Sequence, residues 1–267
     1  STLYNDNVAR HLSLSKKGAQ AVHPDIIVWP ETAFPDDILR DSQWRPRMEA
    51  VARNFNASFI LGSALLTNDG KDVNALLLLS PRGRWKDVYY KRHLVPFSEY
   101  TPRDPFSGML ARAGAMRSYH FLSGGRAGLF YPAGRRVVLG TAICSEEGYP
   151  ALFRELARQG AGVIVSVLND GWFSRPEALM LHARMAVFRA VESGRPLVRA
   201  ANTGISAVVD PLGRVVKALP LGAEGVLDAP LPRALAATVY VQVGDVSLMI
   251  FLVVGLIVVG RRRMLSV

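Results

Sequence analysis

The sequence contains little that would bind a metal, a nucleotide or a second thiol. Its 267 residues include one cysteine, Cys144, so an internal disulfide is excluded and the redox compartment is not indicated. The five histidines are scattered, and the cysteine has no partner at the spacing of metal ligands. A Gly-rich phosphate loop and the signatures of nucleic-acid-binding modules are also missing. We therefore predict no metal, no cofactor and no nucleic-acid partner.

Acidic residues are outnumbered. The chain has 32 Lys and Arg residues against 22 Asp and Glu residues, which gives a net charge of +10. A basic surface suits either nucleic acid or an anionic membrane. Many of the basic residues are isolated arginines that form no single run, which favours the membrane. With 49% hydrophobic residues, the chain can form one large α/β domain with an appendage.

An uncharged apolar segment near the C-terminus supports the membrane assignment. Residues 246–260 have the sequence VSLMIFLVVGLIVVG, and three arginines follow at once. With the weakly polar residues before it, the segment approaches the roughly 20 residues that a bilayer requires. The alternative is a buried core helix, but a basic cluster directly after an apolar run is typical of the cytoplasmic end of a membrane span. We predict a large domain at residues 1–235, and a transmembrane helix with a short cytoplasmic tail at residues 236–267.

The other end of the chain offers no route across a membrane. It begins at Ser1 without a methionine, and it has no signal sequence. The orientation given by the arginines places the large domain on the outer side of the membrane. We therefore expect a truncated or processed chain.

Hydrophobic runs alternate with helical patterns along the large domain. Strands are predicted at residues 25–29, 57–66, 73–80, 85–91, 136–143, 161–168, 196–201, 205–210 and 215–218, and helices at 5–20, 44–54, 151–159 and 176–194. This order predicts an α/β fold that contains a meander of strands. Residues 103–125 lack a clear period and place apolar residues among arginines. They fit either a lid that touches lipid or a partly ordered surface loop.

Cys144 lies where a predicted strand ends and the chain turns toward a helix. A nucleophile is commonly presented at such a turn, because nearby backbone N–H groups can face a developing oxyanion. A lone cysteine is more often a small buried hydrophobic residue. The position alone therefore leaves both interpretations open.

Two other strand ends carry groups that could act on a thiol. Glu31 follows one predicted strand between two prolines, and Lys91 ends another. A carboxylate could accept the proton of the thiol, and an ammonium could lower its pKa and stabilise an oxyanion. A solvated loop carboxylate and a surface lysine are the alternatives. Spacing along the chain does not show that Glu31, Lys91 and Cys144 meet.

Three separated motifs resemble a known family. WPE at residues 29–31, YKRHLVPFSEY at 90–100 and ICSE at 143–146 are similar to the Glu, Lys and Cys signatures of the nitrilase, or carbon–nitrogen hydrolase, superfamily. Within it the chain resembles the apolipoprotein N-acyltransferases, which complete the maturation of bacterial lipoproteins. The narrower resemblance rests on WPETAFP at 29–35, KRHLVPFSEYTP at 91–102, NDGWF at 169–173, GRPLVRAANTGISAVVDPLG at 194–213 and the terminal apolar segment.

The resemblance implies an α-β-β-α sandwich with a Glu–Lys–Cys triad. Glu31 would be the general base, Lys91 the oxyanion stabiliser and Cys144 the nucleophile. Cys144 would take an acyl chain from a phospholipid as a thioester and pass it to the α-amine of a diacylglyceryl-cysteine. The expected partners are thus a phospholipid donor, a lipoprotein acceptor and the bilayer. The expected location is the bacterial inner membrane, with the catalytic domain on its periplasmic side.

The resemblance also implies supporting residues and two departures from the family pattern. Glu99 and Glu146 match polar positions near the thiol, and Trp172 belongs to the NDGWF motif. An aromatic residue often follows the cysteine in the family, whereas this chain has Ser145. Family members also begin with several membrane-spanning helices that this chain lacks.

Two other functions stay possible on the sequence. A membrane-tethered amidase or nitrile hydrolase would use the same triad with water as the acceptor. A non-catalytic binding domain on a membrane anchor would be expected to have lost members of the triad, yet all three positions are filled.

Overall fold

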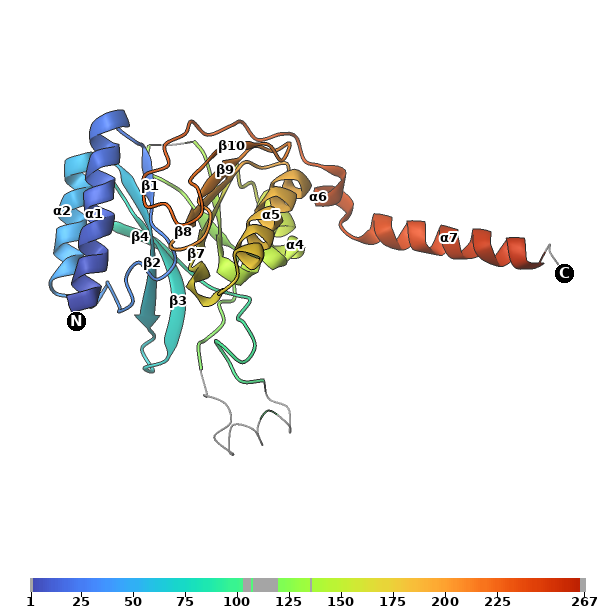
Figure 1. Ribbon diagram of the computed structural model, residues 1–267, viewed down its shortest axis with the longest axis horizontal. Coiled ribbons are helices and arrows are strands. Elements are labelled where there is room, and N and C mark those ends of the chain that lie inside the picture. The colour runs from blue at the N-terminus through green and yellow to red at the C-terminus, as the bar shows by residue number, and fades with distance from the viewer. Residues whose placement is uncertain (1, 103–106, 108–119, 135, 265–267) are drawn as a thin grey trace.

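Two mixed β-sheets form the centre of the computed structural model, which describes residues 2–102, 107, 120–134 and 136–264 (Figure 1). The first sheet has the order β1-β2-β3-β4. Its strands are β1 (Ile26–Val28), β2 (Ser58–Leu66), β3 (Asp72–Leu79) and β4 (Trp85–Tyr90). β1 and β2 run parallel, and the other neighbours run antiparallel.

The second sheet has the order β10-β9-β8-β7-β6-β5. Its strands are β5 (Gly128–Phe130), β6 (Leu139–Ile143), β7 (Val163–Leu168), β8 (Leu197–Ala201), β9 (Ala207–Val209) and β10 (Val215–Ala218). The central strands β6, β7 and β8 run parallel, and the outer strands pair antiparallel. Parallel strands are expected to be apolar on both faces, and β6 and β7 are buried throughout.

The two sheets pack face to face through apolar side chains. Ile60, Leu76, Leu78 and Tyr89 of the first sheet share one buried cluster with the second sheet's Phe130, Leu139, Ile143, Val163, Val165 and Val167. Burying this many aliphatic and aromatic side chains supplies much of the driving force that holds the sheets together. The ends of strands from both sheets are thereby fixed relative to one another.

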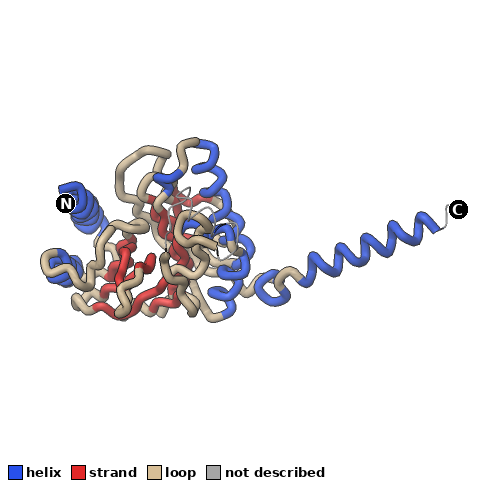
Figure 2. Tube along the Cα trace, turned by 90° about the horizontal axis from the view of Figure 1, so that it is seen from below, coloured by secondary structure: helices blue, strands red, loops and turns tan. Residues whose placement is uncertain are grey.

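Helices cover the outer faces of both sheets. α1 (Thr2–Val22) and α2 (Trp44–Phe55) lie over the first sheet, and α4 (Pro150–Arg158) and α5 (Pro176–Ser193) lie over the second (Figures 1 and 2). The result is the α-β-β-α sandwich that the sequence resemblance implied. Each sequence-predicted strand and helix of the large domain is present within a few residues of its predicted bounds.

Three features differ from the sequence predictions or lie beyond them. The short strand β5 and the short helix α6 (Val239–Val243) were not predicted. α6 is held against α4 because the Arg154 guanidinium donates to the carbonyl oxygens of Tyr240 and Val241. Residues 103–125, for which the sequence left open a lipid-contacting lid and a surface loop, lie largely outside the described residues.

The prediction of a transmembrane helix at the C-terminus is not borne out. A helix, α7 (Val246–Met264), forms there and leads away from the sandwich (Figure 1). Among the residues that the structure describes, no helix is both long enough and apolar enough to cross a bilayer. The uncharged part ends at residue 260. At about 1.5 Å per residue it is shorter than the ~30 Å thickness of a hydrocarbon core.

Candidate active site

Glu31 is held in a buried position just after β1. The residue lies in the turn that follows β1 and is 6% exposed. Asn74 Nδ2 donates to one carboxylate oxygen over 2.7 Å, and the backbone N–H of Asn169 donates to the other over 2.7 Å. Gly62 of β2 lets this loop approach, because a Cβ there would lie 2.3 Å from the Pro30 carbonyl oxygen. The carboxylate is therefore fixed by both sheets.

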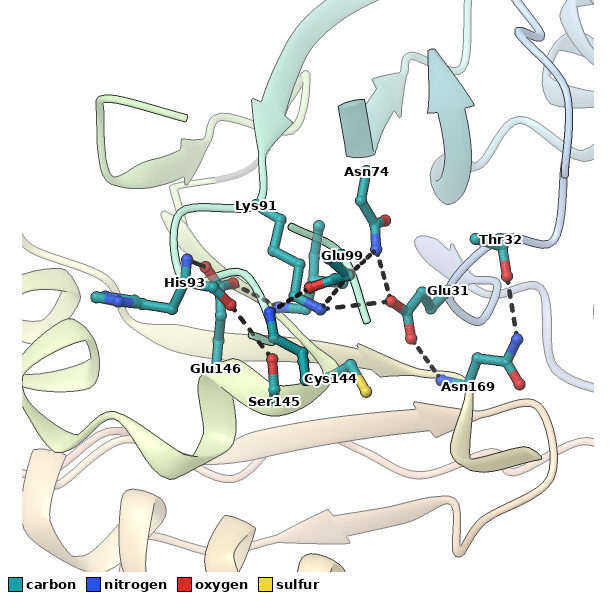
Figure 3. Close-up of polar contacts among 12 residues, drawn as sticks. Glu31, Thr32, Asn74, Lys91, His93, Glu99, Cys144, Ser145, Glu146 and Asn169 are labelled. Atoms are coloured by element: carbon teal, nitrogen blue, oxygen red, sulfur yellow. Dashed lines mark hydrogen bonds and ion pairs between the residues drawn. The ribbon is translucent and has the colours of Figure 1, made fainter. Parts of the chain in front are cut away.

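Lys91 follows β4 and brings a buried ammonium to the same place. The residue is 1% exposed. Its Nζ lies 2.8 Å from Glu99 Oε1 and 3.8 Å from Glu31 Oε1 (Figure 3). Its backbone N–H donates to the Asn74 carbonyl oxygen, which fixes the start of the side chain. A buried charge needs an oppositely charged partner, and the two carboxylates pair with the Lys91 ammonium.

Cys144 occupies a sharp turn between β6 and the 3-10 helix η1 (Cys144–Gly148). Its backbone has a φ of 50°, in the left-handed region that non-glycine residues rarely adopt. Such strain costs about 1–3 kcal/mol and is concentrated at functional sites. Figure 3 shows the side chains of Cys144, Lys91 and Glu31 converging from different strand ends. The structure thus brings together the three residues that the sequence resemblance grouped.

The electrostatics of the three groups are coupled. Burial raises the pKa of Glu31, although the Lys91 ammonium and Asn74 oppose the rise. Burial alone would lower the pKa of Lys91, but Glu31, Cys144 and Glu99 outweigh it and raise the value. Burial and the Glu31 charge raise the pKa of the Cys144 thiol, and Lys91 opposes them. The resting site therefore holds a thiol beside a carboxylate of increased basicity, with a fixed cation next to both.

Glu146 joins the cysteine turn to the end of β4. Its carboxylate accepts four hydrogen bonds, from the Tyr89 hydroxyl and from the backbone N–H groups of Arg92, His93 and Ile143. Burial raises the pKa of this carboxyl, and the hydrogen bonds oppose the rise. Glu146 therefore fixes the distance between the strand that carries Lys91 and the turn that carries Cys144.

Replacing Glu146 by glutamine is expected to destabilise the fold by about 2 kcal/mol or more, because an amide NH₂ would face N–H donors that now meet oxygen. The free energy of unfolding in urea measures the change. Glu155→Gln is the matched control, since Glu155 accepts a bond from Arg92 at 2.7 Å but is partly exposed. That variant should stay within about 1 kcal/mol of the native chain. Equal losses in the two variants would contradict the assigned role of Glu146.

The other predicted supporting residues differ in position. Glu99 contacts Lys91 directly and also accepts from the backbone N–H of Val95. The Ser145 hydroxyl donates to the His93 carbonyl oxygen over 3.3 Å, so it links the cysteine turn to the segment that follows β4. Trp172 lies in the short helix η2 (Asp170–Trp172) and is 81% exposed. No polar contact of Trp172 with the triad is present in the described part of the chain.

Sequence reasoning missed two residues that hold Glu31. Asn74 is the polar residue inside the apolar strand β3, and a buried polar side chain in such a strand requires a partner. Asn169 follows the apolar strand β7 and contributes its backbone N–H. The first could have been suspected from its place in the sequence, whereas a backbone donor leaves no signal in residue type.

Residues 4–240 match the model of the carbon-nitrogen hydrolase family, which covers most of the chain. The chain belongs to the carbon–nitrogen hydrolase family. The sequence is 37% identical over 251 residues to an apolipoprotein N-acyltransferase of Geobacter metallireducens. It is 36% identical over 252 residues to one of Bradyrhizobium diazoefficiens. These relatives confirm the narrower resemblance stated from the motifs.

The matched curated relatives are longer proteins. The alignments cover 90% and 89% of this chain but 46% and 45% of the two relatives. The chain therefore spans about half the length of the curated relatives it matches.

Solved structures of the family share the fold. Saccharomyces cerevisiae Nit3, a member of branch 10 of the nitrilase superfamily, aligns with a TM-score of 0.65 at 18% identity, over 83% of this chain and 82% of that one. A Nesterenkonia amidase of the nitrilase superfamily aligns with a TM-score of 0.61 at 17% identity, over 82% and 81%. These likenesses establish the nitrilase-like sandwich.

Proposed function

We propose that the chain carries the catalytic domain of an apolipoprotein N-acyltransferase, with Cys144 as nucleophile, Glu31 as general base and Lys91 as oxyanion stabiliser. The observation that carries the proposal is the convergence of these side chains at one buried point between the sheets, in a chain 37% identical to such an enzyme. The proposed catalytic domain, residues 1–235, contains all three.

In the first stage the Cys144 sulfur attacks the ester carbonyl carbon of a phospholipid, and the thiol proton passes to Glu31. The new oxyanion lies beside the Lys91 ammonium, which stabilises it. The ester C–O bond then breaks, and Glu31 returns the proton to the departing lysophospholipid hydroxyl. The acyl chain stays on sulfur as a thioester.

In the second stage the α-amine of a diacylglyceryl-cysteine attacks the thioester carbon. A C–N bond forms as the C–S bond breaks, and the amine proton passes by way of Glu31 to the cysteine sulfur. The same cation serves the second oxyanion. The amide product leaves the thiol in its starting protonation state, so the site is ready for another donor.

The pKa values of the Glu31 carboxyl and the Cys144 thiol suit these proton transfers. A base of raised pKa is more able to accept a proton from a thiol whose own pKa is raised. Glu99 keeps Lys91 charged and in place, because it accepts from Nζ at 2.8 Å. Lys91 can therefore act as a fixed positive charge in both stages.

The partners and location follow from the substrates. A phospholipid donor and a lipidated acceptor are both membrane components, and a net charge of +10 suits an anionic membrane surface. We propose that the domain lies at the bacterial inner membrane, on its periplasmic side.

The alternative function is an amidase or nitrilase-type hydrolase, in which water discharges the thioester. It agrees with the description of the family whose model matches residues 4–240, carbon-nitrogen hydrolase. Both functions share the first covalent step and differ in the second nucleophile.

The two are separated by a transfer assay in detergent micelles or vesicles that contain phospholipid. A synthetic diacylglyceryl-cysteine peptide is added, and its mass is followed. We expect the peptide to gain one fatty-acyl mass as an amide that resists hydroxylamine. Release of free fatty acid with an unchanged peptide, or turnover of a simple amide, would favour the hydrolase.

A further inference from the structure

A second buried polar cluster lies behind the cysteine turn, and the proposed triad does not include it. His182 of α5 is at its centre, with Glu147 of η1, Asp170 of η2 and Arg199 of β8 around it. All four residues are buried. The packing of α5 against the second sheet therefore places an imidazole directly behind the nucleophile.

Both ring nitrogens of His182 face hydrogen-bond acceptors. Nδ1 lies 2.8 Å from Asp170 Oδ1. Nε2 lies 3.3 Å from the backbone carbonyl oxygen of Cys144 and 3.5 Å from Glu147 Oε2. A neutral imidazole has one N–H, so one of its nitrogens would direct a lone pair at an oxygen. The imidazolium, with two N–H groups, satisfies both sides.

The charges of the cluster agree with this protonation state. Arg199 lies between the carboxylates, with Nε 3.2 Å from Glu147 Oε2 and one terminal nitrogen 3.1 Å from Asp170 Oδ2. Two buried carboxylates facing one guanidinium leave one negative charge uncompensated. A positive His182 neutralises it, which burial of charge strongly favours.

The cluster connects the two halves of the proposed active site. Cys144 and Glu147 belong to the turn of the nucleophile, while Asp170 directly follows Asn169, whose N–H donates to Glu31 over 2.7 Å. A cation that contacts both turns holds the nucleophile close to the support of the base. It also opposes relaxation of the left-handed Cys144 backbone.

We propose that His182 is a positioning residue for the acyl transfer: its doubly protonated ring joins the Cys144 carbonyl to the Glu147 and Asp170 carboxylates and so holds the thiol toward Lys91 and Glu31. This inference rests on the proposed role of Cys144 as nucleophile. His182 itself touches no reacting atom.

The proposal has a pH dependence of definite sign. Burial lowers the pKa of His182, but Asp170 and Glu147 outweigh it and raise the value above the ordinary 6.5. Arg199 also faces the ring and acts in the opposite direction. The protonated ring therefore contributes fully below about pH 6.5, and its contribution is lost as pH rises through the raised pKa.

The first test uses the unmodified chain. Nitrogen NMR of histidine-labelled protein reports the protonation of each imidazole. We expect one ring, assigned to His182 by its absence in His182→Asn, to carry two N–H groups at pH 7 and to titrate above 6.5. A neutral His182 ring at pH 7 would overturn the proposal. If His182→Asn does not fold, the ring is assigned by elimination, from single variants of the other four histidines.

The second test measures alkylation of Cys144 by iodoacetamide, which needs no lipid and is independent of the acyl-transfer function. His182→Asn keeps an N–H near the Nδ1 position but loses the contact with Cys144. We expect alkylation about tenfold slower than in the native chain at pH 6.5. The two rates should converge at alkaline pH, where the native ring has lost its proton.

Two further variants sharpen that comparison. His182→Gln carries an N–H near the Nε2 position and should recover part of the rate. His23→Asn is the matched control, because His23 is exposed at φ 47° and asparagine tolerates this backbone. A rate ratio that stays constant with pH, an unchanged or faster rate in His182→Asn, or no recovery in His182→Gln would each contradict the proposal.

Discussion

Replacing Cys144 by alanine is expected to lower acyl transfer by about 10⁴- to 10⁶-fold, to the background rate, because no other nucleophile can form the thioester. The side chain is small and lies at a turn, so the fold should persist. Transfer to the diacylated peptide is measured by mass, and folding by circular dichroism. Cys144→Ser should behave in the same way, since a hydroxyl of much higher pKa replaces the thiol.

The matched control for this loss is Ser166→Ala. Ser166 is buried in β7, and its hydroxyl has no hydrogen-bond partner among the described residues. The substitution removes one heavy atom from the same sheet without touching the site. Transfer should stay within about twofold of the native rate, because no bond is lost. Retained transfer in Cys144→Ala, with this control active, would exclude Cys144 as the nucleophile.

Replacing Lys91 by methionine is expected to affect both stability and chemistry. The ammonium lies 3.8 Å from Glu31 and 2.8 Å from Glu99, so its removal leaves one buried and one partly buried carboxylate without a cation. Breaking a buried ion pair in this way costs about 3–5 kcal/mol. Loss of the oxyanion partner should also slow thioester formation by about 10²- to 10³-fold. Urea unfolding and the rate of acyl-adduct formation measure the two effects.

The stability loss in Lys91→Met should depend on pH. The pKa of Glu31, which burial already raises above 4.5, should rise further once the cation that lowers it is gone. A carboxyl with a raised folded pKa contributes most below its unfolded value and least above its folded value. The deficit relative to the native chain should therefore be largest at neutral pH and shrink toward pH 4.5.

A double variant separates the two effects. Lys91→Met with Glu99→Gln removes the cation together with one of its carboxylates, so part of the lost stability should return, although Glu31 stays without a cation. Thioester formation should stay slow, because the oxyanion still lacks its cation. Normal acylation in a folded Lys91→Met chain would contradict the oxyanion role, whatever happens to stability.

Much of the fold could be predicted because its strands are locally distinct. β2, β3 and β7 are apolar runs bounded by turn residues, and such runs identify strands without tertiary information. β5 has three residues and pairs only with β6, so its extended form depends on a neighbour that is distant in sequence. The pairing of the two sheets is likewise a tertiary property. It followed from the family resemblance and not from periodicity.

The transmembrane prediction is not borne out by the described residues, in which no helix is both long enough and apolar enough to cross a bilayer. The uncharged apolar run and the three arginines directly after it favoured a span, but the uncharged run stops at residue 260. Basic residues beside an apolar segment indicate which side of a membrane that end faces, but they do not make a short segment long enough to span the bilayer.

The three residues of the proposed triad could be predicted from their residue types and from their positions at the ends of strands. Glu31, Lys91 and Cys144 each follow a strand, and family motifs group them. The supports were harder to predict, because Asn169 acts through its backbone and His182 lies on a helix whose periodic residues are apolar. Its partner Arg199 is located in β8, so no local pattern links the two.

Intact-mass spectrometry of the chain after incubation with phospholipid, in the absence of an acceptor, detects the proposed thioester on Cys144. We expect one added fatty-acyl mass that maps to Cys144, is removed by hydroxylamine at neutral pH, and is discharged by a diacylated lipopeptide. An unchanged mass after incubation, while an amide or nitrile substrate is turned over, would contradict the acyltransferase function.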